Sequence, residues 1–298
     1  MKKKLLLIMA ILCLVALLAG LLVACNDKPA PQPEPPTDPS EPAEPGETGG
    51  LEFYLKEDGT YMVSNYTGSE TDVVIPVKHD NKAVTEIGPS AFAYRSLITS
   101  ITIPSSVTKI GDQAFYNCLS LTTINYNAAA VENKGIDSEV FRNAGTQGEG
   151  ITLTFGNNVT SIPDNLFYAT KAPNIVTMTT GACVQSIGEQ TFANLPTLTT
   201  VTISNSVTDI AATAFEDSTG ITTATMPISA VNKVPQNSLR TVTLTDGEYL
   251  GYDLSDAGME NVGFAGCLTL ESVTLPETIE HIGASTFAAC KELSSLTI

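Results

Sequence analysis

The sequence offers few side chains that could carry out acid–base or nucleophilic catalysis. It has two histidines, His79 and His281, which are far apart in the chain, and we expect both to be exposed to solvent. Serine and threonine are frequent, but no Gly-x-Ser-x-Gly elbow, His-Glu-x-x-His pair or phosphate-binding loop is present. A carboxylate pair for glycoside hydrolysis stays open, although 6% aromatic residues and no Trp disfavour it. We therefore expect a protein that is not an enzyme, with no cofactor and no metal ion.

The charge of the chain limits the partners that it can have. The formal net charge is −17 at pH 7, from 15 basic and 32 acidic residues. Without the first 24 residues, which hold three Lys and no acid, the balance becomes 12 against 32, or −20. Such a surface repels nucleic acid and anionic lipid headgroups. The sequence thus excludes a nucleic-acid partner.

The elements that must position any binding residues come from an internal repeat. A phenylalanine closes each unit, Leu239 takes its place once, and successive marks are 23 to 26 residues apart. The marks are Phe92, Phe115, Phe141, Phe167, Phe192, Phe215, Leu239, Phe264 and Phe287. Self-similarity at so constant a period indicates a repeat architecture.

Each unit has the same order of local structural elements. The alternation in Ile101-Thr102-Ile103 predicts a short strand, and Pro104 ends it because proline cannot donate to a ladder. Gly111 stands at a turn where a Cβ would be costly, and Ala114 and Phe115 complete the coil with buried groups. One unit cannot bury its own apolar face, whereas stacked units can. We therefore predict a right-handed solenoid of about nine coils, with strands about 4.8 Å apart.

Aligning the repeats places hydroxyl side chains in two columns on the outward face of the strands. The column of Thr102 contains Thr102, Asn125, Thr154, Thr177, Thr202, Thr225, Thr243, Thr274 and Thr297. The column two residues earlier contains Ser100, Thr123, Thr152, Ile175, Thr200, Thr223, Thr241, Ser272 and Ser295. Threonine suits a solvated sheet face, so the columns can be purely structural. They can equally form a binding face, with candidates Ser100, Thr102, Thr123, Thr154, Thr177, Thr200, Thr202, Thr225, Thr243 and Thr274.

The cysteines also follow the repeat. Cys118, Cys267 and Cys290 each fall three residues after a repeat phenylalanine, in a slot that we expect to be small and buried. Cys267 and Cys290 occupy matching positions in adjacent coils, so a disulfide between them is possible. Buried free thiols that act as small hydrophobic groups are the preferred interpretation. No set of ligands converges on a metal site.

The segment "SITIPSSVTKIGDQAF" (residues 100–115) resembles the BspA-type leucine-rich repeat of bacterial surface proteins. The segment 141–167 resembles a longer variant of that repeat, and the resemblance spans about residues 51–298. It implies a leucine-rich repeat solenoid over 77–298, preceded by an N-terminal β-hairpin cap over 51–76. Asp58-Gly59 is the expected hairpin turn. The pattern is blurred over 224–261, where the coil geometry is doubtful.

The last residues open a repeat that does not continue. "LSSLTI" (residues 293–298) matches the start of the preceding unit, "LESVTL" (residues 270–275). Solenoids usually end in a polar cap, and an open strand edge invites pairing with another chain. We therefore expect the C-terminal repeat to be incomplete, as in a fragment of a longer gene product.

The N-terminus carries a targeting signal. "MKKK" and the apolar run 5–24 have the form of a secretory signal peptide over residues 1–24. "LVAC" (residues 22–25) resembles the lipobox of bacterial lipoproteins, in which Cys25 would be lipidated. An uncleaved membrane anchor is the alternative. Residues 25–50 hold eight prolines and six acids and predict an extended, disordered linker.

The resemblance implies a lipid-anchored, extracytoplasmic protein of the cell surface that mediates adhesion. Members of that family bind host extracellular-matrix or surface proteins, or other bacteria. Contact with the membrane is expected only through the N-terminal lipid. A glycan-binding lipoprotein and a structural spacer for further C-terminal domains are the alternatives.

Overall fold

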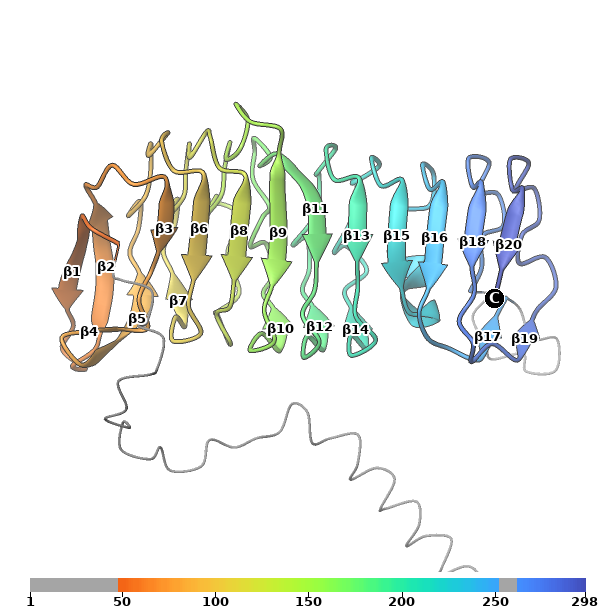
Figure 1. The fold of residues 1–298 in the computed structure, drawn as a ribbon, viewed down its shortest axis with the longest axis horizontal. Coiled ribbons are helices and arrows are strands. Elements are labelled where there is room, and N and C mark those ends of the chain that lie inside the picture. Colours follow the sequence, from red (N-terminus) through yellow and green to blue (C-terminus); the bar gives the residue numbers. More distant parts are fainter. Residues whose placement is uncertain (1–47, 252–261) are drawn as a thin grey trace, which may run out of the picture. The chain divides into compact units, whose positions relative to one another are not determined.

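A computed structural model describes residues 48–251 and 262–298 (Figure 1). The predicted signal peptide, Cys25 and nearly all of the predicted linker lie outside these ranges. The end of the linker belongs to the fold, because the buried Thr48 hydroxyl accepts a hydrogen bond from the Val74 amide at 2.8 Å. None of the helices in the described ranges has the length and apolar character needed to cross a bilayer.

The fold begins with the predicted β-hairpin. Strands β1 (Leu51–Leu55) and β2 (Tyr61–Tyr66) pair antiparallel. The amide of Lys56 donates to the carbonyl of Thr60 across the turn, where Gly59 has a φ of 82°. The turn at Asp58-Gly59 is thus confirmed. β2 continues into parallel pairing with β5 (Lys82–Ile87), which joins the hairpin to the first coil.

Ten parallel strands form the main sheet and run side by side along the solenoid (Figure 1). In chain order they are β3 (Asp72–Val74), β6 (Ser100–Ile103), β8 (Thr123–Tyr126), β9 (Ile151–Phe155), β11 (Ile175–Thr179), β13 (Thr200–Thr202), β15 (Thr223–Met226), β16 (Thr241–Leu244), β18 (Ser272–Thr274) and β20 (Ser295–Thr297). The predicted solenoid is therefore confirmed. The sheet already starts at β3, inside the region expected to be only a cap.

Shorter strands line the opposite side of the coils. Two of them flank β5, which pairs antiparallel with β4 and parallel with β7; three more make a separate sheet, and the last two pair with each other. They are β4 (Lys78–His79), β7 (Lys109–Ile110), β10 (Ser161–Ile162), β12 (Ser186–Ile187), β14 (Asp209–Ile210), β17 (Tyr249–Leu250) and β19 (His281–Ile282). A 3₁₀ helix, η1 (Ile228–Lys233), follows β15 in place of a second strand.

The core lies between the two sides of each coil, and the repeat phenylalanines form a stack through it. The rings of Phe92 and Phe115 lie 5.2 Å apart and nearly parallel, and Phe141 continues the stack at 4.8 Å from Phe115. Inward residues of the strands, such as Ile101 and Ile103, are fully buried beside it. The apolar half of the repeat is therefore accounted for by packing between neighbouring coils.

The blurred region keeps its strand register. β15 and β16 pair in parallel over four residues, with Thr223 opposite Thr241 and Thr225 opposite Thr243. Among the described residues the irregularity is on the other side of the coil, where η1 is found. Residues 252–261 of this region lie outside the described ranges. The doubt about coil geometry therefore does not extend to the main sheet.

Candidate functional site

The outward face of the ten-stranded sheet carries two columns of partly or fully exposed side chains, which are polar at every position except Val74. One column runs through Asp72, Ser100, Thr123, Thr152, Thr177, Thr200, Thr223, Thr241, Ser272 and Ser295. The other runs through Val74, Thr102, Asn125, Thr154, Thr179, Thr202, Thr225, Thr243, Thr274 and Thr297. We call these two columns the hydroxyl face. All ten candidate binding residues belong to it.

The alignment of β11 was wrong, and the structure corrects it. Thr177 lies opposite Thr152 and Thr200, so it belongs to the column of Ser100, while Thr179 takes its place in the column of Thr102. Ile175 is fully buried and is not part of the face. A bulge between Ile175 and Thr177 causes the change, since an extra residue reverses the side to which the preceding side chain points.

Few hydroxyls of the hydroxyl face bond to other side chains in the described part of the chain. Asn125 donates to Thr102 Oγ1 at 3.3 Å, and the hydroxyls of Thr274 and Thr297 lie 3.2 Å apart. Threonines just before the strands behave differently, since Thr122 Oγ1 donates to the Thr99 carbonyl of the preceding coil at 3.1 Å. The scaffold therefore uses the hydroxyls before the strands and leaves most of those on the face to solvent or a ligand.

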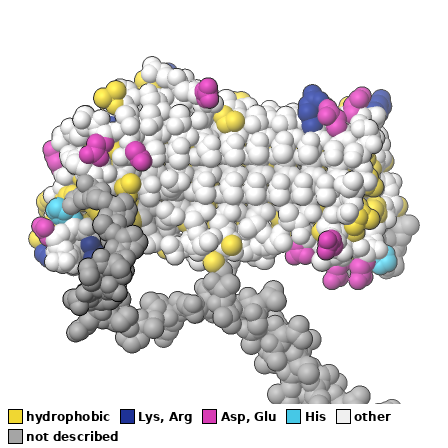
Figure 2. Space-filling model, in the orientation of Figure 1, with side chains coloured by type: hydrophobic (Ala, Val, Ile, Leu, Met, Phe, Trp, Pro, Cys, Tyr) yellow, Lys and Arg dark blue, Asp and Glu magenta, His cyan; other side chains and the backbone are white. Residues whose placement is uncertain are grey.

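The hydroxyl face is almost uncharged. Among its described residues only Asp72, on the first strand, is ionisable. Figure 2 shows the middle of this side of the molecule without coloured side chains, whereas charged and hydrophobic groups gather towards the two ends. At one end Arg240 pairs with Glu271, beside the last strands. The net charge of −17 is therefore carried elsewhere.

The two histidines differ from each other in their surroundings. His79 is half-buried in β4 and its ring stacks on Phe53 at 3.9 Å, with Tyr61 edge-on at 4.9 Å. The expectation that His79 is fully exposed is therefore wrong, because the hairpin cap supplies aromatic neighbours. His281 in β19 is exposed, as expected, and stacks on Tyr249.

Cys118, Cys267 and Cys290 are free thiols, so the possible disulfide between Cys267 and Cys290 is not formed in the structure. Their slot is also not purely hydrophobic. Cys118 Sγ donates to the Phe92 carbonyl at 3.1 Å, and Cys290 Sγ donates to the Phe264 carbonyl at 3.0 Å. Burial raises the pKa of the Cys118 thiol to about 12, which keeps this donor protonated.

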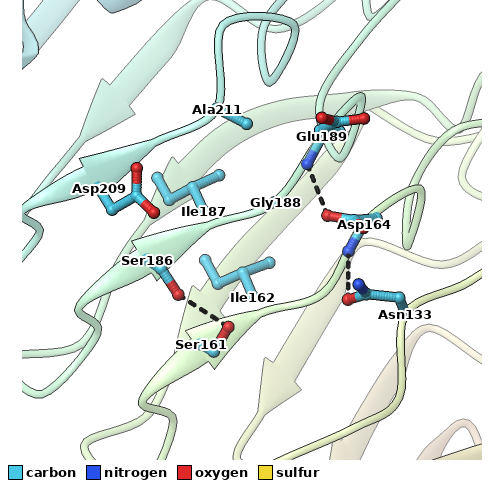
Figure 3. A pocket seen from close by; sticks show the side chains of 10 residues that line it. All are labelled: Asn133, Ser161, Ile162, Asp164, Ser186, Ile187, Gly188, Glu189, Asp209 and Ala211. Atoms are coloured by element: carbon cyan, nitrogen blue, oxygen red, sulfur yellow. Dashed lines mark hydrogen bonds between the residues drawn. The ribbon is translucent and has the colours of Figure 1, made fainter.

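A shallow depression of about 320 Å³, which the sequence did not reveal, lies on the opposite side of the coils (Figure 3). Carboxylates of Asp164, Glu189 and Asp209 and the hydroxyls of Ser161 and Ser186 line it. Asp164 Oδ1 accepts a hydrogen bond from the Glu189 amide at 2.7 Å, so part of the acidic lining holds the backbone. No group of three or more potential ligands is arranged for a metal ion within the described ranges.

Comparison with known proteins identifies the repeat. The family model described as "BspA type Leucine rich repeat region" matches in six copies, over residues 66–180, 132–245 and 258–298. A search of curated proteins finds no significant match.

Three solved structures show the range of similarity. A leucine-rich repeat protein of T. pallidum is 20% identical over 84% of this chain and 91% of its own, with a TM-score of 0.40. A leucine-rich cell surface protein of Faecalibacterium prausnitzii is 20% identical, covering 85% and 94%, with a TM-score of 0.34. A leucine-rich repeat protein of Bacteroides ovatus is 18% identical, covering 82% and 80%, with a TM-score of 0.30.

The matched residues cover most of the chain and coincide with the stacked coils. The residues that recur are those of the buried stack and the strands, which are also the residues on which the sequence resemblance rests. The chain belongs to the BspA-type leucine-rich repeat family.

Proposed function

We propose that this protein is displayed outside the cytoplasm and binds a protein ligand through its hydroxyl face. The ligand is a host extracellular-matrix or surface protein, or a protein of another cell. In this proposal the chain performs no catalysis, and a lipid on Cys25 tethers it to the membrane. The observation that carries the proposal is the extended hydroxyl face, which is polar, nearly uncharged and largely unused by the scaffold.

The shape of the hydroxyl face favours a macromolecular ligand over a small one. Ten parallel strands about 4.8 Å apart extend over roughly 43 Å. Small molecules usually bind in concave pockets, whereas a protein interface needs on the order of 800 Å² per partner. A broad row of short side chains, most of them threonine or serine, provides such an area and can form hydrogen bonds along most of its length.

The absence of charge on the described hydroxyl face supports the same proposal. An acidic surface repels other acidic proteins, and like charges placed opposite each other at an interface cost several kcal/mol. Because the net charge of −17 is kept off the face, a partner can approach the hydroxyl columns without this penalty.

The proposal is tested with the full chain on an array of purified extracellular-matrix proteins beside an array of polysaccharides. Thr202→Lys and Thr243→Lys introduce long charged groups into the middle of the hydroxyl face and are expected to weaken protein binding at least about tenfold. Thr208→Lys is the matched control, because Thr208 is an exposed threonine just before β14 on the opposite side. Binding to polysaccharides alone would defeat the proposal and favour the glycan-binding alternative.

The lipid tether has its own test in bacteria that produce the full chain. Cys25→Ser removes the only sulfur that the proposed lipobox offers for acylation. The variant is expected to leave the detergent-extracted membrane fraction, or to keep an uncleaved signal peptide on a gel. A variant that stays membrane-bound at the mature size contradicts lipidation at Cys25.

A further inference from the structure

One exposed tyrosine occupies a backbone position that tyrosine disfavours. Tyr94 has a φ of 61°, in the left-handed region, and its ring remains 67% exposed. Neighbouring coils carry asparagine at the same place, namely Asn117, Asn143 and Asn194, with φ of 55–60°. Asparagine tolerates this conformation, whereas a bulky side chain is an outlier there. Tyr94 thus breaks a local rule without gaining burial.

Tyr94 packs against Tyr116, which in turn contacts Arg142. The ring of Tyr116 meets that of Tyr94 edge-on at 5.1 Å, and the Arg142 guanidinium lies 5.4 Å from the centre of the Tyr116 ring. Leu97, which is 64% exposed, lies three residues further along the same loop. We call Tyr94, Leu97, Tyr116 and Arg142 the aromatic ledge. Tyrosine and arginine are the residue types that most often dominate binding energy at protein interfaces.

The scaffold holds the aromatic ledge rigidly. The Tyr94 amide donates to the Tyr116 carbonyl at 2.8 Å, and the Asn117 amide donates to the Arg142 carbonyl at 3.0 Å. These bonds tie three successive coils together directly beneath the ledge. Side chains on such a frame lose little conformational freedom on binding, which favours affinity.

Together with Glu139, which pairs with Arg142, the aromatic ledge carries no net charge. Arg142 Nη1 is paired at 2.6 Å with the carboxylate of Glu139, which is itself buried and also accepts from the Thr170 hydroxyl. The arginine is therefore neutralised on its own protein and covers the face of Tyr116. What the ledge presents to a partner is an amphipathic, uncharged surface.

The loops that carry the aromatic ledge lead into strands of the hydroxyl face. These loops run from the repeat phenylalanines into β6, β8 and β9, along the edge of the main sheet where these strands begin (Figure 1). Leu97 precedes Ser100, the first hydroxyl of its column, by three residues. A partner that covers the N-terminal part of the hydroxyl face is thus placed to reach the ledge as well.

We propose that the aromatic ledge is the anchor at which the protein ligand binds most strongly, and that it fits an uncharged, apolar patch on that ligand. This inference rests on the proposed function and names the part of the surface that supplies most of the binding energy. The unfavourable backbone of Tyr94 is then explained, because residues that break local rules are expected at functional sites.

The test compares two exposed tyrosines in the full chain, on the same array of purified extracellular-matrix proteins. Tyr94→Asn restores the residue of the sister coils and removes the ring, and Tyr54→Asn removes an equally exposed ring from β1. Tyr94→Asn is expected to weaken binding at least about tenfold without lowering the melting temperature. Tyr54→Asn is expected to change binding less than about twofold, and raising the salt concentration to leave wild-type binding within about threefold.

Each other outcome identifies what has failed. If the wild-type chain binds no matrix protein, the proposed function fails and the aromatic ledge fails with it. If Thr202→Lys weakens binding and Tyr94→Asn does not, the ledge alone is wrong. A steep loss of binding with salt overturns the uncharged character of the contact. If Tyr94→Asn loses polysaccharide binding and keeps protein binding, the ledge binds sugars and the inference is overturned.

Discussion

At the scale of single residues, the small side chain three positions after the repeat phenylalanine has a role that its size alone does not show. Cys118 and Cys290 donate to the phenylalanine carbonyl of the preceding coil, and Ser218 does the same towards Phe192 at 2.5 Å. The Phe92 and Phe264 carbonyls also accept from the backbone amides of Arg95 and Cys267, so a small residue with a donor supplies a second hydrogen bond there. Ala144 and Leu195 occupy the same slot without a side-chain donor. Cysteine and serine are both small and both carry a donor, which explains why they interchange here.

Substitutions at Cys118 separate volume from hydrogen bonding. We expect Cys118→Ser to keep the free energy of unfolding within about 1 kcal/mol of wild type, because its hydroxyl replaces the donor. Cys118→Val supplies an apolar side chain without a donor, and we expect a loss of about 0.5–1.5 kcal/mol, since the Phe92 carbonyl keeps its bond from the Arg95 amide. Urea unfolding followed by circular dichroism measures both. Equal stability of the two variants would show that the bond to the Phe92 carbonyl contributes nothing.

At the scale of the coil, the spacing between neighbours leaves no room for some side-chain atoms. A Cβ on Gly111 would lie 2.3 Å from the nitrogen of Pro89 in the preceding coil. The sequence predicts a turn at this glycine, whereas the structure shows a close approach of two backbones. Gly111 does not have a positive φ, so its backbone conformation does not require glycine. The requirement for glycine comes from the contact between the two coils.

The glycine constraint is tested with a matched pair. Gly111→Ala is expected to lower the free energy of unfolding by about 1–3 kcal/mol, since the backbones of two coils must move apart. Gly135→Ala is the control, because a Cβ there meets no atom within 4 Å. Thermal and urea unfolding of both variants give the comparison. A Gly111→Ala chain as stable as the control would contradict the contact.

At the scale of the whole described fold, the two ends of the solenoid differ. The hairpin of β1 and β2 joins the first coil and helps to bury Val63 and Tyr66 completely. At the other end, β20 pairs only with β18, and all three of its residues are exposed. Because each coil contacts only its neighbours, stability in a solenoid is a sum of local terms. The terminal strands should therefore open before the central ones.

Hydrogen exchange of the full chain tests this difference along the solenoid. Amides of β19 and β20 are expected to exchange at least about a hundredfold faster than those of β9 and β13, because local opening costs less free energy there. Amides of β1 and β2 are expected to exchange at rates closer to those of the central strands. Uniform exchange from β9 to β20 would show that the described coils open as one unit.

The sequence by itself determined the repeat, the parallel sheet, the hairpin turn at Asp58-Gly59 and the outward columns of eight of the ten strands, all except β3 and β11. These features follow from the period of the apolar residues, because every coil must bury the same groups. The sequence placed Thr177 in the wrong column, because either Val176 or Met178 can be the first inward residue of the run Ile175–Thr179. Packing between the coils selects Met178 as that inward residue, and Met178 is fully buried.

The tertiary structure alone decided what surrounds each residue across neighbouring coils. The stacking of His79 on Phe53, the bond from Cys118 to Phe92 and the ledge around Tyr94 all join residues that lie more than twenty positions apart. A repeat pattern states which positions are equivalent, but equivalent positions become neighbours only when the coils stack. The side chains that depart from the pattern then meet across neighbouring coils, which the repeat pattern alone does not reveal.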